Sequence, residues 1–264
     1  MDILAEIISH KRKEVEDRKA LYPVRLLEQS IYFSSPPVQL TKYLLREDKS
    51  GIIAEIKRKS PSKGLINPYI SIERTSIGYM QAGASALSVL TDHHYFGGSN
   101  DDLTQARKFN FCPILRKDFI VDEYQIIEAK SIGADAILLI ASALSSPLIK
   151  DWVKLAHSLN LQVLLEVHSK NEVVENLDSG ADLIGVNNRD LKTFEVNVEV
   201  SRQLAPHIPE KMIKVSESGI ESPKVIAELS EYGYKGFIIG QNFMQHNRPE
   251  LAAREFIKNL RRNK

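Results

Sequence analysis

Cysteine is nearly absent from this sequence, because Cys112 is the only one among 264 residues. One thiol forms neither a disulfide within the chain nor a zinc site of several cysteines, so the composition is compatible with a reducing compartment. An excess of charge is missing as well, since 35 Lys and Arg stand against 34 Asp and Glu, for a formal net charge of +1. Without a strong overall field, nucleic acid and an anionic membrane are poor partners for the chain.

Long apolar runs are missing too. The longest ones, such as residues 136–141, are far shorter than the roughly 18 residues of a membrane-spanning helix. Asp2 and Glu6 lie where an export signal would carry positive charge, and no cleavage site of small residues follows. We therefore expect a mature cytoplasmic protein. Near its start, Leu4, Ile7 and Val15 repeat at helical spacing, which predicts an amphipathic helix with basic residues 11–13 on its solvated face.

A short run rich in Ile, Leu and Val recurs eight times after residue 50. The runs begin near residues 51, 86, 113, 136, 162, 183, 213 and 236. Helical patterns follow them at residues 71–82, 100–109, 122–132, 145–159, 169–179, 197–207, 222–232 and 248–262. Continuous apolar strands are typical of parallel sheets covered by helices on both faces. The pattern predicts an α/β fold, a (β/α)8 TIM barrel, as a single domain over residues 1–264 with an N-terminal helical extension over residues 1–50.

An open doubly wound sheet is the alternative to a barrel. Such a sheet usually carries a dinucleotide fingerprint after its first strand. No GxGxxG and no GxxxxGK[ST] motif follows any predicted strand. The sequence therefore favours the barrel and argues against a nucleotide cofactor.

Polar residues gather at the carboxyl ends of the predicted strands, where barrels of this kind carry their active sites. Glu55 and Lys57 are two residues apart in the first strand, so they point to the same face. The other strand ends supply Lys117, Glu166, Asn187, Arg189, Glu217 and Ser218. Such a set contains proton donors and acceptors that tune one another's pKa, which predicts acid–base catalysis.

Neighbours of this set have supporting or open roles. Arg116 and Asp118 have the opposite strand parity to Lys117, which predicts a salt bridge that supports it. His168 lies two residues after Glu166 and either orients it or lies at the rim.

Two loops are predicted to bind phosphate. Gly219 and Gly240 follow the last two strands, where main-chain N–H groups can hold an anion, although both glycines can equally be plain turn residues. The loop RKSPSKGLINP at residues 58–68 is basic and longer than the roughly two to six residues common at such joints. It is predicted to close over an anionic substrate, with an ordinary solvated loop as the alternative.

Neither a metal site nor a catalytic thiol is expected. His93, His94 and Asp92 lack further ligands at suitable spacing, so we predict no metal. Cys112 precedes a strand start, which predicts a buried thiol at the end of the barrel away from the active site.

These strand ends resemble the indole-3-glycerol-phosphate synthase family. The most specific motif is IIAEIKRKSPSKGLI at residues 52–66. Similar motifs are LTDHHYFGGS at 90–99, ILRKDFIVDEYQIIEA at 114–129, LLEVH at 164–168, GVNNRDLKTF at 185–194 and VSESGI at 215–220. The resemblance implies a carboxy-lyase of tryptophan biosynthesis. It would close the ring of 1-(2-carboxyphenylamino)-1-deoxyribulose 5-phosphate with loss of CO2 and water, and without a cofactor.

The resemblance also implies residue roles. Lys117 would protonate the ribulose carbonyl, Glu166 would be the base of the dehydration, and Glu55 would position nearby groups. Lys57 would contact the substrate, and which lysine donates in which step stays open. The implied substrate-binding residues are Ser60, Phe96, Asn187, Arg189, Glu217 and Ser218, and the implied phosphate-binding residues are Lys57, Gly219, Gly240 and Gln241. Gln241 departs from the Ser or Glu expected of the family. Residues 1–50 would pack over the barrel mouth.

Two rival functions remain open from the sequence. One is a phosphate-binding barrel enzyme like phosphoribosylanthranilate isomerase, which uses a cysteine and an aspartate, but Cys112 lies at the wrong strand end for that chemistry. The other is an inactive barrel scaffold, which predicts missing acids and bases. The expected partner is a small anionic phosphate substrate, in a monomer or weak oligomer, with a pathway enzyme as a further candidate.

Overall fold

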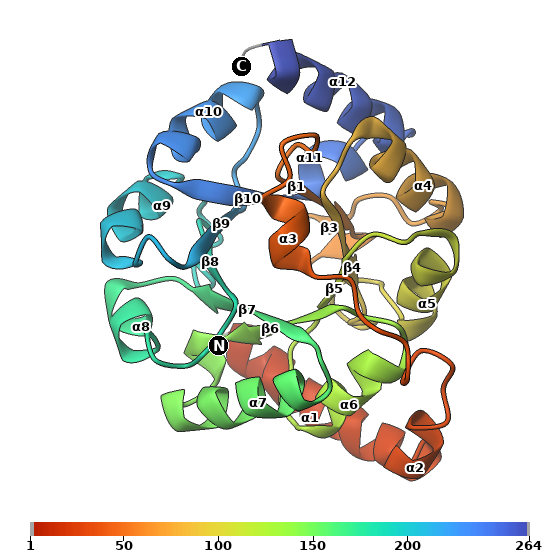
Figure 1. Cartoon of the computed structure of the whole chain (residues 1–264). Helices are drawn as coiled ribbons and strands as arrows, with labels where there is room; N and C mark the ends of the chain where they lie inside the picture. Colours follow the sequence, from red (N-terminus) through yellow and green to blue (C-terminus); the bar gives the residue numbers. More distant parts are fainter. Residues whose placement is uncertain (1–2, 263–264) are drawn as a thin grey trace.

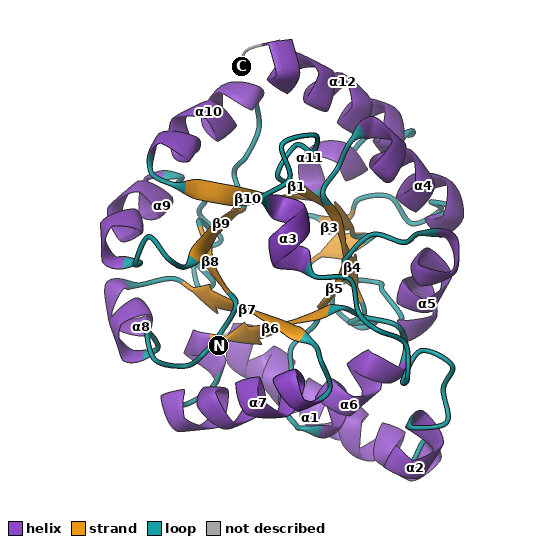
Figure 2. Cartoon of the chain, viewed as in Figure 1, coloured by secondary structure: helices purple, strands orange, loops and turns teal. Residues whose placement is uncertain are grey.

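A closed ring of eight parallel strands forms the centre of the computed structural model, which describes residues 3–262 (Figures 1 and 2). The strands are β1 (Ile52–Ile56), β4 (Ala86–Leu90), β5 (Ile114–Lys117), β6 (Ala136–Ile140), β7 (Gln162–Val167), β8 (Leu183–Asn187), β9 (Ile213–Glu217) and β10 (Tyr234–Ile239). β1 pairs in parallel with both β4 and β10, which closes the sheet. The predicted TIM barrel is confirmed.

Helices alternate with these strands and surround the ring. They are α4 (Ile72–Ala82), α5 (Asn100–Phe109), α6 (Tyr124–Ser131), α7 (Ser146–Ser158), α8 (Lys170–Glu175), α9 (Glu199–Leu204), α10 (Pro223–Glu231) and α12 (Pro249–Arg262). The Ser71, Ser99 and Ser169 hydroxyls each accept a hydrogen bond from the third residue of the helix that follows, as helix caps do. α8 is shorter than predicted, and the Asn176 amide donates to the Glu172 carbonyl at its end.

The core has two layers because successive strand residues point to opposite faces. Ala54 and Ile56 of β1 face outward and pack with the surrounding helices. Ile53 faces inward and packs with apolar side chains from the other strands inside the barrel. Cys112 is buried in the outer layer, and burial raises the pKa of its thiol to about 12. Such a thiol stays protonated, which is in line with the buried, structural cysteine predicted.

The amino-terminal segment contains α1 (Ile3–Leu21), α2 (Val24–Leu27) and α3 (Leu40–Leu44). Ile3, Leu4 and Ile7 of α1 line a cavity that the carboxyl ends of the strands also line. Leu40 and Leu44 of α3 instead join the inner layer, beside residues at the amino ends of the strands, and Figure 1 shows α3 across the centre of the ring. Residues 40–44 therefore lie at the opposite end of the barrel, which corrects the expectation that all of 1–50 covers the mouth.

Lys11 corrects a second prediction, because it does not belong to a solvated face. Its side chain is 1% exposed and its Nζ lies 2.8 Å from Asp92 Oδ2, 3.1 Å from Asp118 Oδ1 and 3.0 Å from Glu14 Oε2. Burial lowers the pKa of Lys11, but the three carboxylates outweigh burial and raise it. α1 is thus joined to the ends of β4 and β5 through a buried charge.

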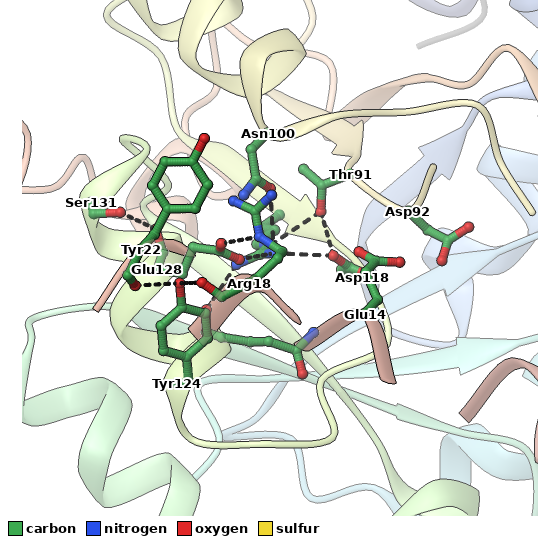
Figure 3. A network of polar contacts seen from close by, with 12 residues as sticks. Glu14, Arg18, Tyr22, Thr91, Asp92, Asn100, Asp118, Tyr124, Glu128 and Ser131 are labelled. Atoms are coloured by element: carbon green, nitrogen blue, oxygen red, sulfur yellow. Dashed lines mark hydrogen bonds and ion pairs between the residues drawn. The ribbon is translucent and has the colours of Figure 1, made fainter. Parts of the chain in front are cut away.

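The ion pairs continue from Asp118 into the barrel wall, and Figure 3 shows several members of this network. Arg116 lies 3.1 Å from Asp118 and 2.6 Å from Glu128, so the predicted Arg116–Asp118 salt bridge is confirmed. Arg18 of α1 reaches the other oxygen of Glu128 at 2.5 Å.

Within residues 3–262, no helix combines the length and the apolar character needed to cross a bilayer.

Candidate active site

A cavity of about 770 Å³ lies at the carboxyl ends of the strands. All the residues predicted for catalysis or binding line it, namely Glu55, Lys57, Ser60, Phe96, Lys117, Glu166, Asn187, Arg189, Glu217, Ser218, Gly219, Gly240 and Gln241. The barrel brings them together because the carboxyl ends of parallel strands meet at one end of the ring. Lining residues that the sequence did not single out include Pro61, Phe119, Leu191 and Phe194. Their only signal was an apolar side chain in a loop after a strand.

The centre of the cavity is a lysine between two carboxylates. Lys117 Nζ donates to Glu166 Oε2 and to Glu217 Oε2, both at 2.8 Å. The three side chains come from β5, β7 and β9 and are at most 12% exposed. Burial lowers the pKa of Lys117, but Glu166 and Glu217 outweigh burial and raise it, so this ammonium stays charged at neutral pH.

The two carboxylates beside Lys117 titrate in opposite directions. Burial raises the pKa of Glu166, but Lys117 and His168 outweigh burial and hold it well below its usual range. Burial and the neighbouring Glu166 raise the pKa of Glu217 to about 7. Environments that push two carboxyl pKa values apart are typical of acid–base sites, where one group stays ionised and the other holds a proton.

Asn187 connects this centre to the loop after β9. Its Nδ2 donates to Glu166 Oε1 at 3.2 Å, and its Oδ1 accepts from the Ser218 hydroxyl at 2.9 Å. Asn188 supports the same loop, since its Nδ2 donates to the Ser218 carbonyl at 3.0 Å. The sequence assigned no role to Asn188, because its partner lies 30 residues away.

Two glycines make room for two of the carboxylates. A Cβ on Gly240 would clash with Glu55 Oε1, and a Cβ on Gly185 would lie 3.2 Å from Glu217 Oε1. Glu55 itself pairs with Lys57 Nζ at 2.7 Å, as their shared face predicted. Gly240 was predicted only as a donor of main-chain N–H. Its contact with Glu55 depends on the closure of β10 against β1, which the sequence pattern around Gly240 does not reveal.

The loops predicted to bind phosphate lie side by side. Asn242 in the short helix α11 (Gln241–Met244) donates from Nδ2 to the Ile220 and Glu221 carbonyls at 3.3 and 3.0 Å. Gly219 has a φ of +76°, in the left-handed region that favours glycine. Although Gln241 departs from the residue expected of the family, Asn242 still joins the two glycine-bearing loops.

The basic loop at 58–68 is held at both ends. Arg58 makes a two-pronged ion pair with Asp102, and the Asn67 amide donates to the Met244 and His246 carbonyls at 3.1 and 2.9 Å. Between these ends a two-stranded hairpin forms from β2 (Lys59–Ser60) and β3 (Gly64–Leu65). Closure of this loop over a substrate remains a prediction.

The side chains of residues 3–262 also lack the grouping that a metal-binding site needs. No group of three or more His, Cys, Asp or Glu side chains there is arranged to hold a metal ion. Asp92 is turned to Lys11 and also accepts from the backbone N–H groups of Tyr95 and Phe96.

The family model of indole-3-glycerol phosphate synthase matches residues 4–256 of the chain. The chain belongs to the indole-3-glycerol phosphate synthase family. A family member from Bacteroides thetaiotaomicron is 46% identical over 257 residues, which cover 97% of this chain and 98% of the relative. One from Caldanaerobacter subterraneus is 41% identical over 260 residues, which cover 98% and 99%.

Solved structures extend the likeness to the fold alone. Thiamine phosphate pyrophosphorylase from Pyrococcus furiosus superposes with a TM-score of 0.59 at 16% identity, covering 80% of this chain and 95% of that one. At such low identity the likeness is evidence for the barrel fold and for nothing further.

Gly240→Ala tests the contact with Glu55. The new methyl group must displace the Glu55 carboxylate, so we expect kcat to fall by about 10²-fold if Glu55 acts as predicted, the effect of a misplacement of about 1 Å. The measurement is steady-state turnover of the family substrate. Gly180→Ala is the control for adding a methyl group to a glycine, because Gly180 lies outside the cavity lining and a Cβ there meets only Val153 at 3.5 Å. Its φ of +83° adds backbone strain that Gly240, at a φ of −117°, does not have. Equal kcat in the two variants would contradict the prediction.

Proposed function

We propose that the protein is an indole-3-glycerol-phosphate synthase, a carbon–carbon lyase of tryptophan biosynthesis. It converts 1-(2-carboxyphenylamino)-1-deoxyribulose 5-phosphate to indole-3-glycerol phosphate, CO2 and water. The observation that carries the proposal is the buried Lys117 held 2.8 Å from both Glu166 and Glu217 in a cavity between glycine-bearing loops. Membership of the family supplies the reaction that this arrangement fits.

Ring closure is the step assigned to Lys117. The ammonium protonates the ribulose carbonyl oxygen while the aromatic carbon that bears the carboxylate attacks the carbonyl carbon. Loss of CO2 from that carbon then restores the aromatic ring. The aniline nitrogen supplies the electrons, so the protein contributes a proton donor, a base and a site that excludes water. Burial and Glu166 raise the pKa of Glu217 to about 7, so this carboxyl is partly protonated beside the lysine near neutral pH.

Dehydration is the step assigned to Glu166. Its low pKa keeps it ionised, so it can accept a proton from the intermediate while the hydroxyl leaves as water. Lys57, paired with Glu55 at 2.7 Å, is a further proton donor within the cavity. We assign it to the substrate's phosphate side or to the departing hydroxyl.

The ends of the substrate have separate environments. The phosphate is assigned to the main chain at Gly219, Gly240 and Gln241, where the loops after β9 and β10 meet. The carboxyphenyl ring is assigned to the apolar side of the cavity, where the Phe96 and Phe119 ring centroids lie 5.8 Å apart. Four further polar lining residues are assigned to the intermediates, namely Ser60, Asn187, Arg189 and Ser218.

A fluorescence assay tests the proposal. We expect the purified protein to develop indole fluorescence from the carboxyphenylamino substrate without added metal. Phosphoribosylanthranilate, the substrate of the isomerase rival, is expected to remain unchanged, because Cys112 is buried before β5 at the other end of the barrel. No fluorescence at high enzyme concentration would sink the synthase function and favour the inactive scaffold.

A further inference from the structure

His168 lies directly behind the proposed base. It follows β7, two residues after Glu166, and its side chain is 15% exposed. Nε2 lies 3.4 Å from Glu166 Oε1, and Nδ1 lies 3.5 Å from Glu172 Oε2. Both ring nitrogens are shielded from solvent, and His168 is absent from the cavity lining. The ring therefore lies next to Glu166 and outside the cavity lining.

The surroundings of the ring select its charged form. A neutral imidazole has one N–H and one lone pair, so either tautomer would turn a lone pair towards a carboxylate. The imidazolium has an N–H on both nitrogens and a positive charge within ion-pair distance of each carboxylate, although neither contact has hydrogen-bond geometry. Burial lowers the pKa of His168, but Glu166 and Glu172 outweigh burial and raise it to about 10.

Glu172 fixes the ring from the far side. It is the third residue of α8, where its backbone N–H donates to the Ser169 hydroxyl at 3.3 Å. Its carboxylate accepts from the His168 backbone N–H at 2.8 Å. This arrangement is a capping box shifted by one residue, and it gives the carboxylate little freedom to leave the ring. The start of α8 is thus connected through His168 to Glu166.

The two carboxylates beside Lys117 differ in their other neighbours. Each receives one hydrogen bond of 2.8 Å from the lysine. Glu166 Oε1 also faces His168 and the Asn187 amide, whereas Glu217 Oε1 is buried with no hydrogen-bond partner. An unpartnered buried carboxylate oxygen favours protonation, and a neighbouring cation favours ionisation.

We infer that His168 is a positioning residue that decides which of the two carboxylates beside Lys117 acts as the base. Held between Glu166 and Glu172, its positive charge orients Glu166 and keeps that carboxylate unprotonated, which leaves the shared proton on Glu217. The role of Glu166 as the base in this inference rests on the proposed function. The charged state of the ring stands independently of it.

The first test is the protonation state of the ring in the wild-type protein. The probe is ¹⁵N NMR of histidine-labelled enzyme at about pH 7.5, with the His168 signal assigned by its loss in His168→Gln. We expect both ring nitrogens to carry protons. A neutral tautomer would overturn the inference. Because this measurement needs no turnover, it separates failure of the inference from failure of the proposed function.

The second test is the pH dependence of kcat in His168→Gln. The charged groups facing the ring are Glu166 from β7 and Glu172 from α8, and Glu166 also faces Lys117 and Glu217. Without the imidazolium the pKa of Glu166 rises, so Glu166 takes up a proton at a higher pH than in the wild type as the pH is lowered. We therefore expect the acid limb of the kcat profile to move to higher pH by about one pH unit. KM at alkaline pH should stay within about 3-fold, because a residue outside the cavity lining contributes little binding.

Two further variants complete the experiment. Glu172→Gln removes the far-side carboxylate without touching Glu166, and we expect a shift in the same direction as in His168→Gln. His157→Gln is the matched control, because His157 pairs with Asp182 at 2.9 Å on the outer surface and should leave the acid limb in place. If kcat of His168→Gln falls by the same factor at every pH and the acid limb does not shift, the role of His168 is merely structural and the inference is overturned.

Discussion

The substitution Lys117→Met is expected to lower kcat by about 10²- to 10⁴-fold, the range that a positioned acid contributes. The substitution removes the proton donor, and it also leaves Glu166 and Glu217 facing each other without the cation that lies 2.8 Å from each. Two carboxylates so placed share a proton, so the substitution perturbs the base in addition to removing the acid. Titration with indole-3-glycerol phosphate should still give saturable binding, because the phosphate loops are untouched.

The assignment of Lys117 to ring closure has a separate readout. Decarboxylation follows closure, so Lys117→Met should stop both CO2 release and indole fluorescence. Glu166→Gln should instead release CO2 in a single turnover and delay the indole signal, because it affects only dehydration. Lys154→Met on the exposed surface of α7 is the control for replacing a lysine by methionine. Turnover in Lys117→Met within 10-fold of the wild type would remove Lys117 from its proposed role.

Lys11→Met is expected to lower the free energy of unfolding by about 3 to 5 kcal/mol, the usual cost of breaking a buried ion pair by removing one partner. Asp92 and Asp118 lie 2.8 and 3.1 Å from Lys11 Nζ, and both would lose this cation while buried. Burial raises the pKa of Asp118, but Lys11 and Arg116 outweigh burial and lower it. Without Lys11 we expect this pKa to rise. Urea denaturation followed by circular dichroism measures the change.

A lysine on the same helix provides the control. Lys19 pairs with Asp122 at 2.6 Å, but their side chains are 43% and 32% exposed, so Lys19→Met should cost at most about 1 kcal/mol. Should Lys11→Met fail to fold, the double variant Lys11→Met with Asp92→Asn removes one unpaired charge and should recover part of the stability. Equal unfolding free energies for Lys11→Met and Lys19→Met would contradict the prediction.

The fold was accessible from the sequence because its signals are local. Each strand is a short apolar run and each helix has its own periodicity, so the predicted helix at 100–109 coincides with α5 (Asn100–Phe109). Strand parity correctly placed Glu55 and Lys57 on one face and set Arg116 against Asp118. Local patterns failed where a partner lies far along the chain. Lys11 reads as a solvated lysine until Asp92 and Asp118 close around it.

The sequence by itself determined the eightfold repeat, the end of the barrel that carries the chemistry, and the residue types available there. These follow from side-chain period and strand direction, which short segments encode. Only the tertiary structure decided which charges meet: Lys117 with both Glu166 and Glu217, Gly240 against Glu55, and His168 between Glu166 and Glu172. Electrostatic interactions depend on distances of a few ångströms across separate strands, and closure of the ring sets those distances.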